Sequence, residues 1–207
     1  MSPSSPPSSS RTEVVPATAA APLAKAILEL VGHVPASRQT ASAQPGVHAD
    51  QLARAAARQA ALAAGSLALP PGPLGWLTVL PELVTVWRIQ ARLVADIAGL
   101  YGQHAQLGRE QMLYCLFKHT AAQAVRDLVV RAGERFLVQT VSSRVLQSVA
   151  QGIGLRVGRQ VIGKGVSRWL PLVGAMGVGA YAYADTRQVA RTAIEMFERG
   201  VITAGQP

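Results

Sequence analysis

Apolar positions recur with a helical period along most of the chain. Leu23, Ile27 and Val31 share one side of a first short helix. A second helix can begin at Asp50, where an aspartate can cap it, and runs toward Gly65 with a face made mostly of alanine. Such a face suits close approach of another helix. No run alternates apolar and polar residues with a period of two, so the pattern predicts an all-α fold.

The helix expected from Glu82 to Tyr101 is too apolar for an ordinary surface helix. At about 100° per residue, Arg88, Arg92 and Asp96 share one arc, and apolar side chains cover most of the rest. A helix of this kind is buried on two sides or lies in lipid. Gln90 falls inside the apolar arc, where we expect it to form a buried hydrogen bond to a neighbouring helix.

Glycines and polar residues mark the ends of the remaining helices. Gly102 can end the apolar helix and Gly108 can cap the next one, with further helix expected to about Ala150. Asp185, followed three residues later by a glutamine, resembles a capping box and predicts the start of the last helix, which ends at Gly200.

Two apolar segments are interrupted by proline and glycine. Residues 59–81 contain no charged residue, but four prolines prevent a continuous spanning helix. Residues 169–184 form a second uncharged segment, with a proline and three glycines. Each segment is either a bent, buried element or a re-entrant or interfacial hairpin, and the sequence leaves both open. The side chains expected to contact a membrane or a partner are Leu74, Trp76, Leu77, Leu80, Trp169, Leu170, Leu172 and Val173.

Composition and charge favour an apolar environment. Hydrophobic residues make up 49% of the chain and charged residues 15%, against about 25% in typical domains. Of the net charge of +9, six positive charges lie in residues 135–168, which contain no acidic residue. Basic residues beside an apolar segment attract anionic headgroups, although a merely solvated basic face stays open. Nucleic acid is disfavoured because no aromatic stacking set accompanies the arginines. The expected anionic-lipid contacts are Arg156, Arg159, Lys164 and Arg168.

The chain divides into a tail, one helical domain and a short end. Residues 1–47 are rich in Pro, Ser and Ala, with a disordered start and one possible short helix. Residues 48–200 form the helical domain, and 201–207 a C-terminal tail. The first residues lack the basic start and apolar core of a signal peptide, which predicts a cytoplasmic origin. The single cysteine, Cys115, excludes an internal disulfide framework and a cysteine-rich zinc site.

Candidate chemistry is sparse. Residues 158–165 nearly spell a phosphate-binding loop, but Gly165 replaces the required hydroxyl. Cys115 and His119 lie one helical turn apart, as a nucleophile pair would, yet a polar stripe lining the core is the favoured interpretation. Asp96 and Asp185 each have an arginine nearby, which indicates ion pairing or capping. We therefore expect no catalytic residue, metal or cofactor. The candidate structural polar residues are Gln90, Arg92, Asp96, His119 and Asp185.

Several short runs together carry a resemblance. They are Pro73, Leu80-Pro81, Asp96-Ile97-Ala98 and Tyr101-Gly102 in the first half, and Ile162-Gly163-Lys164-Gly165, residues 169–175, Asp185-Thr186 and Ala193 in the second. Over residues 50–198 the chain resembles the EcsC family of bacterial proteins. It is also similar to the membrane-associated helical domains attached to some bacterial GTPases. The resemblance implies a helical, often membrane-associated protein without an agreed biochemical activity, and it supplies no catalytic residues.

Three functions follow as hypotheses. The first is a non-enzymatic helical protein associated, peripherally or partly inserted, with the cytoplasmic face of the bacterial inner membrane and accessory to a membrane or transport process. Its partner would be an anionic phospholipid membrane or a membrane protein. The second is a soluble helical adaptor that binds a partner protein through an exposed apolar stripe. The third is an enzyme that uses Asp96, His119 or Asp185.

Overall fold

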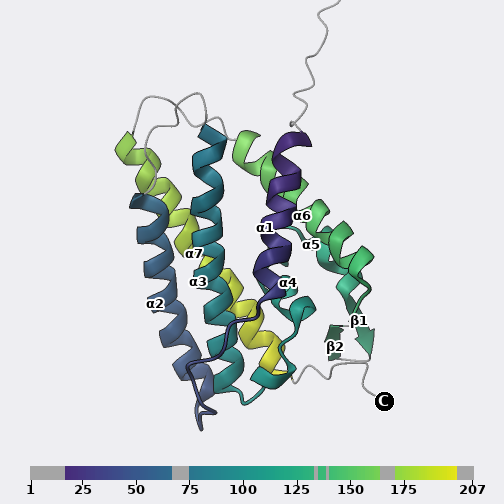
Figure 1. The fold of residues 1–207 in the computed structure, drawn as a ribbon. Helices are drawn as coiled ribbons and strands as arrows, with labels where there is room; N and C mark the ends of the chain where they lie inside the picture. The colour runs from purple at the N-terminus through teal and green to yellow at the C-terminus, as the bar shows by residue number, and fades with distance from the viewer. Residues whose placement is uncertain (1–16, 67–74, 133–134, 139, 164–170, 200–207) are drawn as a thin grey trace, which may run out of the picture.

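The protein is a helical bundle (Figure 1), known from a computed structural model that describes residues 17–66, 75–132, 135–138, 140–163 and 171–199. The all-α, compact multi-helix prediction is confirmed. The α-helices are α1 (Ala17–Gly32), α2 (Pro45–Ser66), α3 (Gly75–Leu100), α4 (Arg109–Phe117), α5 (Ala122–Val125), α6 (Ser143–Gly163) and α7 (Pro171–Glu198). The shorter elements are η1 (His104–Gln106), η2 (Arg126–Leu128), β1 (Val129–Ala132) and β2 (Arg135–Val138).

The helices form two groups that meet around α3 and α4. Helices α2, α3 and α7 pack against one another, and α1 packs against α6. Helix α3 also contacts α1, while α4 contacts α1, α3 and α7 (Figure 1). The main core lies where these helices converge, and its largest fully buried apolar side chains include Ile27, Ile97, Met112, Phe117 and Ile153.

The alanine face of α2 brings α7 unusually close, as the sequence predicts. Its buried positions, spaced three or four residues apart, are Ala49, Ala53, Ala57, Ala60 and Ala64. On the facing helix, a Cβ added to Gly179 would lie 3.1 Å from the carbonyl oxygen of Ala61. Small residues on both helices therefore allow near-contact of the two backbones.

Helix α1 belongs to the compact unit. Leu23, Ile27 and Val31 are buried in the main core. Opposite them, a Cβ on Gly154 would lie 2.8 Å from the Ala20 carbonyl oxygen, so α1 and α6 also touch closely. The sequence-based division placed this helix in the tail. The structure instead begins the packed unit at α1, because the apolar side of α1 covers α6.

Two aspartates predicted as helix caps lie inside helices. Helix α2 begins at Pro45, a residue well suited to a first turn, so Asp50 lies one turn further in. Helix α7 begins at Pro171 and runs through Asp185, which therefore does not start it. Helix α3 likewise begins at Gly75, before Pro81. The cap assignments were wrong because both helices begin before these aspartates, whose carboxylates contact side chains on other helices and, for Asp50, also Arg54 of α2.

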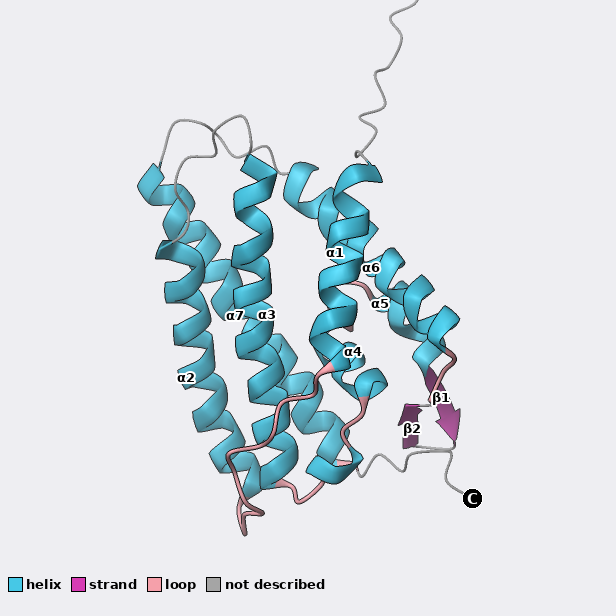
Figure 2. Ribbon diagram, in the orientation of Figure 1, coloured by secondary structure: helices cyan, strands magenta, loops and turns pink. Residues whose placement is uncertain are grey.

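A hairpin replaces part of the helix expected before Ala150. Strands β1 and β2 pair antiparallel, with Val129 opposite Val138 and Ala132 opposite Arg135 (Figure 2). The strand sequences contain three valines and Phe136, residue types that favour strands over helices. Each strand has only four residues, too few for a period-two pattern to stand out.

The predicted helix ends at Gly102 and Gly108 are confirmed. Gly102 has φ of 68°, a left-handed conformation that favours glycine, and Gln103 N–H donates to the Ala98 carbonyl over 2.8 Å. Gly108 is the N-cap of α4, and its N–H donates to Oε1 of Gln111 over 3.0 Å.

The segment between α1 and α2 crosses the end of α3 as a strap (residues 33–44; Figure 2). The carboxylate of Asp96 accepts a 2.7 Å hydrogen bond from the Arg38 backbone N–H. One turn later, a Cβ on Gly99 would collide with Ser37 and with the backbone of Gln39. Asp96 and Gly99 therefore hold this strap against the bundle.

Candidate functional site

The two proline- and glycine-broken segments begin and finish at the same end of the bundle. Figure 1 shows that α2 and α6 finish, and α3 and α7 begin, at the top of the molecule. We call this the connection end. Residues 67–74 and 164–170 join these helix termini in the sequence. Two apolar segments far apart in the chain are therefore attached at one end of the fold.

The structure does not describe most of the side chains that are predicted to contact a membrane or a partner. Leu74, Trp169 and Leu170 are outside the described residues, and the side chains of the four others in the two helices (Trp76, Leu77, Leu172 and Val173) are not described. Leu80 is half-buried and packs against the main core, so part of its side chain stabilises α3.

Three other apolar side chains are exposed toward the connection end. Leu62 of α2 is 74% exposed, and Val178 and Tyr181 of α7 are 41% and 54% exposed. They lie at the same level of the bundle, since Ala61 contacts Gly179. All three belong to the uncharged segments found in the sequence. Their exposure could not be found from periodicity, because it depends on which face α2 and α7 turn toward each other.

Beneath this surface, the described side chains of α2, α3 and α7 form a small buried cluster. It consists of Ala60, Ala64, Val86 and Ala182, is separate from the main core, and has Ile89 packed against it. We call it the small cluster. Three of its four members are alanines, so these described side chains bury little apolar area between the three helices.

A polar layer separates the small cluster from the main core. Nε2 of Gln90 donates to Oδ2 of Asp185 over 2.6 Å and to Oγ1 of Thr186 over 3.2 Å. Nε2 of His119 lies 2.6 Å from the other carboxylate oxygen of Asp185. Gln90 is fully buried, whereas the side chains of Asp185 and His119 are 13% and 19% exposed. The layer ties α3, the end of α4 and α7 together, and includes the contact with a neighbouring helix that the sequence predicts for Gln90.

The two aspartates singled out in the sequence serve different elements. Asp185 belongs to the polar layer, and Asp96 holds the strap through Arg38. The arginine expected beside Asp185, Arg187, instead pairs with Asp50 over 2.8 Å. The hydrogen bond from Arg187 lowers the pKa of the Asp50 carboxyl. Asp96 and Asp185 therefore do not form a carboxylate pair for acid–base chemistry.

The thiol and the imidazole noted in the sequence also have separate partners. Cys115 is fully buried, and its Sγ lies 3.8 Å from Sδ of Met196. Burial raises the pKa of the Cys115 thiol, which keeps it protonated and unreactive. His119 turns to Asp185 instead. This arrangement is that of a structural stripe and not of an activated nucleophile.

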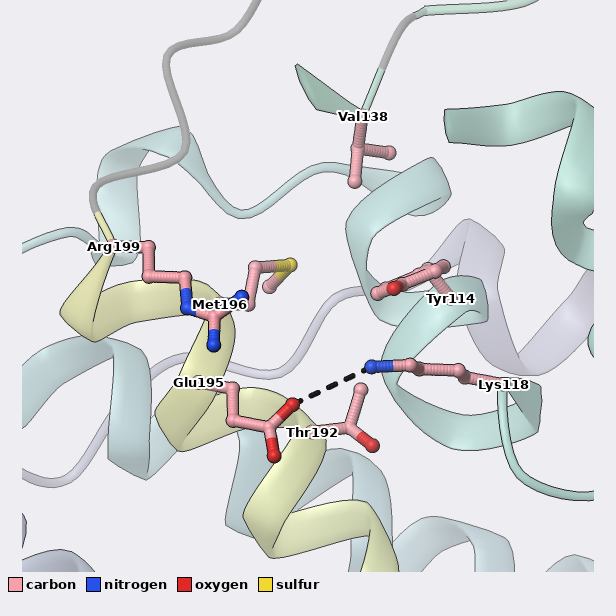
Figure 3. A pocket seen from close by; sticks show the side chains of 7 residues that line it. All are labelled: Tyr114, Lys118, Val138, Thr192, Glu195, Met196 and Arg199. Carbon is pink, nitrogen blue, oxygen red and sulfur yellow. Dashed lines mark hydrogen bonds and ion pairs between the residues drawn. The ribbon is translucent and has the colours of Figure 1, made fainter. Parts of the chain in front are cut away.

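A small pocket lies at the other end of α7 (Figure 3). Its volume is about 30 Å³, and its lining residues are Tyr114, Lys118, Val138, Thr192, Glu195, Met196 and Arg199. Nζ of Lys118 lies 3.4 Å from Oε2 of Glu195 and 5.4 Å from the centre of the Tyr114 ring. A space of this size holds about one water molecule, so it is too small for an organic substrate or cofactor.

Basic residues flank the connection end. Arg156 is exposed on α6, two turns before the helix ends, and Arg58 is exposed on α2, one turn before Leu62. The side chain of Arg159 is not described, and Lys164 and Arg168 lie outside the described residues. Residues 158–163 continue α6, so the near-match to a phosphate loop follows a helix, where such a loop needs a strand.

Among the described residues, no group of three or more His, Cys, Asp or Glu side chains could hold a metal ion. In the same part of the chain, no helix has both the length and the apolarity needed to cross a membrane.

Comparison with known proteins returned no match: neither a family model, nor a curated protein, nor a solved structure is similar to this chain.

Proposed function

We propose that this chain is a non-catalytic helical protein that binds the cytoplasmic face of the bacterial inner membrane through its connection end, as an accessory to a membrane or transport process. The observation that carries the proposal is that the helix termini flanking both broken apolar segments lie at that end, beside the exposed Leu62, Val178 and Tyr181. No family model matches the chain, so the resemblance of its motifs to the EcsC family is part of the same proposal.

Charge supports an anionic lipid surface as the partner. Arg58 and Arg156 are exposed near the connection end, and residues 135–168 carry six basic and no acidic side chains. Each Lys or Arg near an anionic bilayer contributes about 1 kcal/mol of attraction, which salt screens. The basic side chains would bring the protein to the surface, and the apolar ones would then enter the headgroup region.

Apolar contact at the connection end can be tested with a pair of exposed residues on one helix. Leu62 and Val47 are both exposed on α2, but they lie about 22 Å apart along its axis. In co-sedimentation with phosphatidylglycerol-containing vesicles, we expect Leu62→Asp to weaken binding at least severalfold and Val47→Asp to leave it unchanged. Equal losses in both variants, or no sedimentation of the unmodified protein, would contradict the proposal.

The electrostatic contribution to membrane binding can be tested with two exposed arginines on α6. Arg156 and Arg144 are both exposed, about 18 Å apart along the helix, and only Arg156 lies near the connection end. Arg156→Glu should weaken binding to anionic vesicles and leave the weaker binding to phosphatidylcholine vesicles unaltered. Arg144→Glu should leave both unchanged. If the protein binds neither vesicle type, this result would favour the alternative function, a soluble adaptor that binds a partner helix through the same apolar side chains.

A further inference from the structure

The three helices that meet at the connection end are joined by two different kinds of packing. On one side of the polar layer, α7 places Val189, Ala190, Ala193, Met196 and Phe197 in the main core. On the other side, its buried apolar contribution within the described residues is Ala182 in the small cluster. Among the described side chains, most of the buried apolar packing of α7 therefore lies beyond Asp185, toward the C-terminus.

The part of α7 before the polar layer is also suited to an apolar surrounding. Residues 177–184 carry no charge, and Val178 and Tyr181 are already exposed. The face of α2 that this part of α7 covers is alanine, interrupted by no charged side chain between Gln59 and Ser66. Separating the two helices would expose apolar surface, and the described ion pair between α2 and α7, Asp50–Arg187, lies at the other end of α2.

We propose that residues 177–184 of α7 part from residues 57–64 of α2 when the connection end meets an anionic bilayer, with the polar layer at Asp185 as the fixed point of the movement. The inference rests on the proposed function and adds a regulatory step to it: the apolar surface is covered until lipid binds. Lipid favours the opened form because acyl chains cover the uncovered alanine faces, and Arg58 lies beside them to meet headgroups.

The opening can be measured with two pairs of spin labels. Gln59 on α2 and Ala180 on α7 are exposed at the level of the small cluster, and Gln51 and Gln188 are exposed at the level of Asp50 and Arg187. The labels would be attached to the Gln59→Cys/Ala180→Cys protein and, separately, to the Gln51→Cys/Gln188→Cys protein. The native Cys115 is fully buried and should stay unlabelled.

On addition of phosphatidylglycerol-containing vesicles, the distance between the labels at residues 59 and 180 should become longer and more broadly distributed. The distance between the labels at residues 51 and 188 should not change. An unchanged first pair in protein that has sedimented with the vesicles would overturn the opening and leave membrane binding intact. If the protein does not sediment with the vesicles, both the proposed function and the lipid-driven opening are wrong. A shift of both pairs would indicate general unfolding and would also overturn the inference.

Two glycines of α7 give a second, independent test. A Cβ on Gly179 meets the Ala61 carbonyl oxygen at 3.1 Å, whereas one on Gly177 meets nothing within 4 Å. Gly179→Ala should therefore raise the open fraction without lipid and tighten vesicle binding by the same factor, since binding to a minor form is weakened by its population. Gly177→Ala is the control and should not increase either. Equal vesicle affinities of the two variants, with the first showing the broadened label distances, would overturn the coupling between opening and binding.

Discussion

The main core and the connection end of this protein are built from the same helices but held by different side chains. In the main core, Trp87 and Phe117 pack edge to face, with ring centres 5.3 Å apart. At the connection end, α2, α3 and α7 share three alanines and one valine. Burying a large apolar side chain contributes about 1.5–3 kcal/mol, and a methyl group far less. Within one bundle, local stability should therefore fall from the main core toward the connection end.

The largest expected effect comes from removing a ring in the main core. Phe117 is almost completely buried, and Phe117→Ala leaves a cavity that should lower the free energy of unfolding by about 3–5 kcal/mol. Leu62→Ala deletes a comparably large side chain at the exposed connection end and should change it by less than about 0.5 kcal/mol. Urea denaturation of both variants measures the difference. Similar losses would show that the two regions do not differ as described.

The polar layer between the two regions should give an intermediate effect. Asp185→Ala removes the acceptor shared by Gln90 and His119 and leaves the buried Gln90 amide with one acceptor fewer, which should cost about 1–3 kcal/mol. Glu195→Ala, on the same helix, removes only the exposed pair with Lys118 and should cost about 0–1 kcal/mol. The same denaturation measurement distinguishes them, and equal costs would mean that the polar layer does not tie α7 to its neighbours.

Features set by neighbouring residues could be predicted from the sequence, and contacts between distant residues could not. The main-core helices follow from their periodicity, and the alanine face of α2 and the helix end at Gly102 are local signals that the structure bears out. The partners of Asp185 lie 66 and 95 residues away, and Asp96 binds a backbone N–H 58 residues away. No local pattern encodes such distant partners.

Two misassigned features have the same physical origin. The capping box at Asp185 is a correct local pattern, but it was overruled because Pro171 starts the helix earlier and packing on α2 keeps it continuous. The hairpin at β1 and β2 contains strand-favouring valines, but an isolated two-stranded hairpin is only marginally stable, and Val138 packs into the main core. In both places tertiary contacts decided between local alternatives.

The smallest expected effect concerns a carboxyl near the start of α3, on the side of the connection end. Partial burial raises the pKa of Glu82 above its ordinary value of 4.5. The folded protein therefore favours the protonated carboxyl of Glu82. The stability that this carboxyl contributes is present at low pH and is lost as the pH rises through the folded pKa. Glu82→Gln should then raise the free energy of unfolding at pH 7 by less than about 1 kcal/mol, given solvent screening. The gain should disappear at a pH below 4, where the carboxyl is protonated in both states.

Glu29→Gln, at an exposed carboxyl on α1, is the control. A gain that persists unchanged at low pH would show that burial of the charge is not its cause.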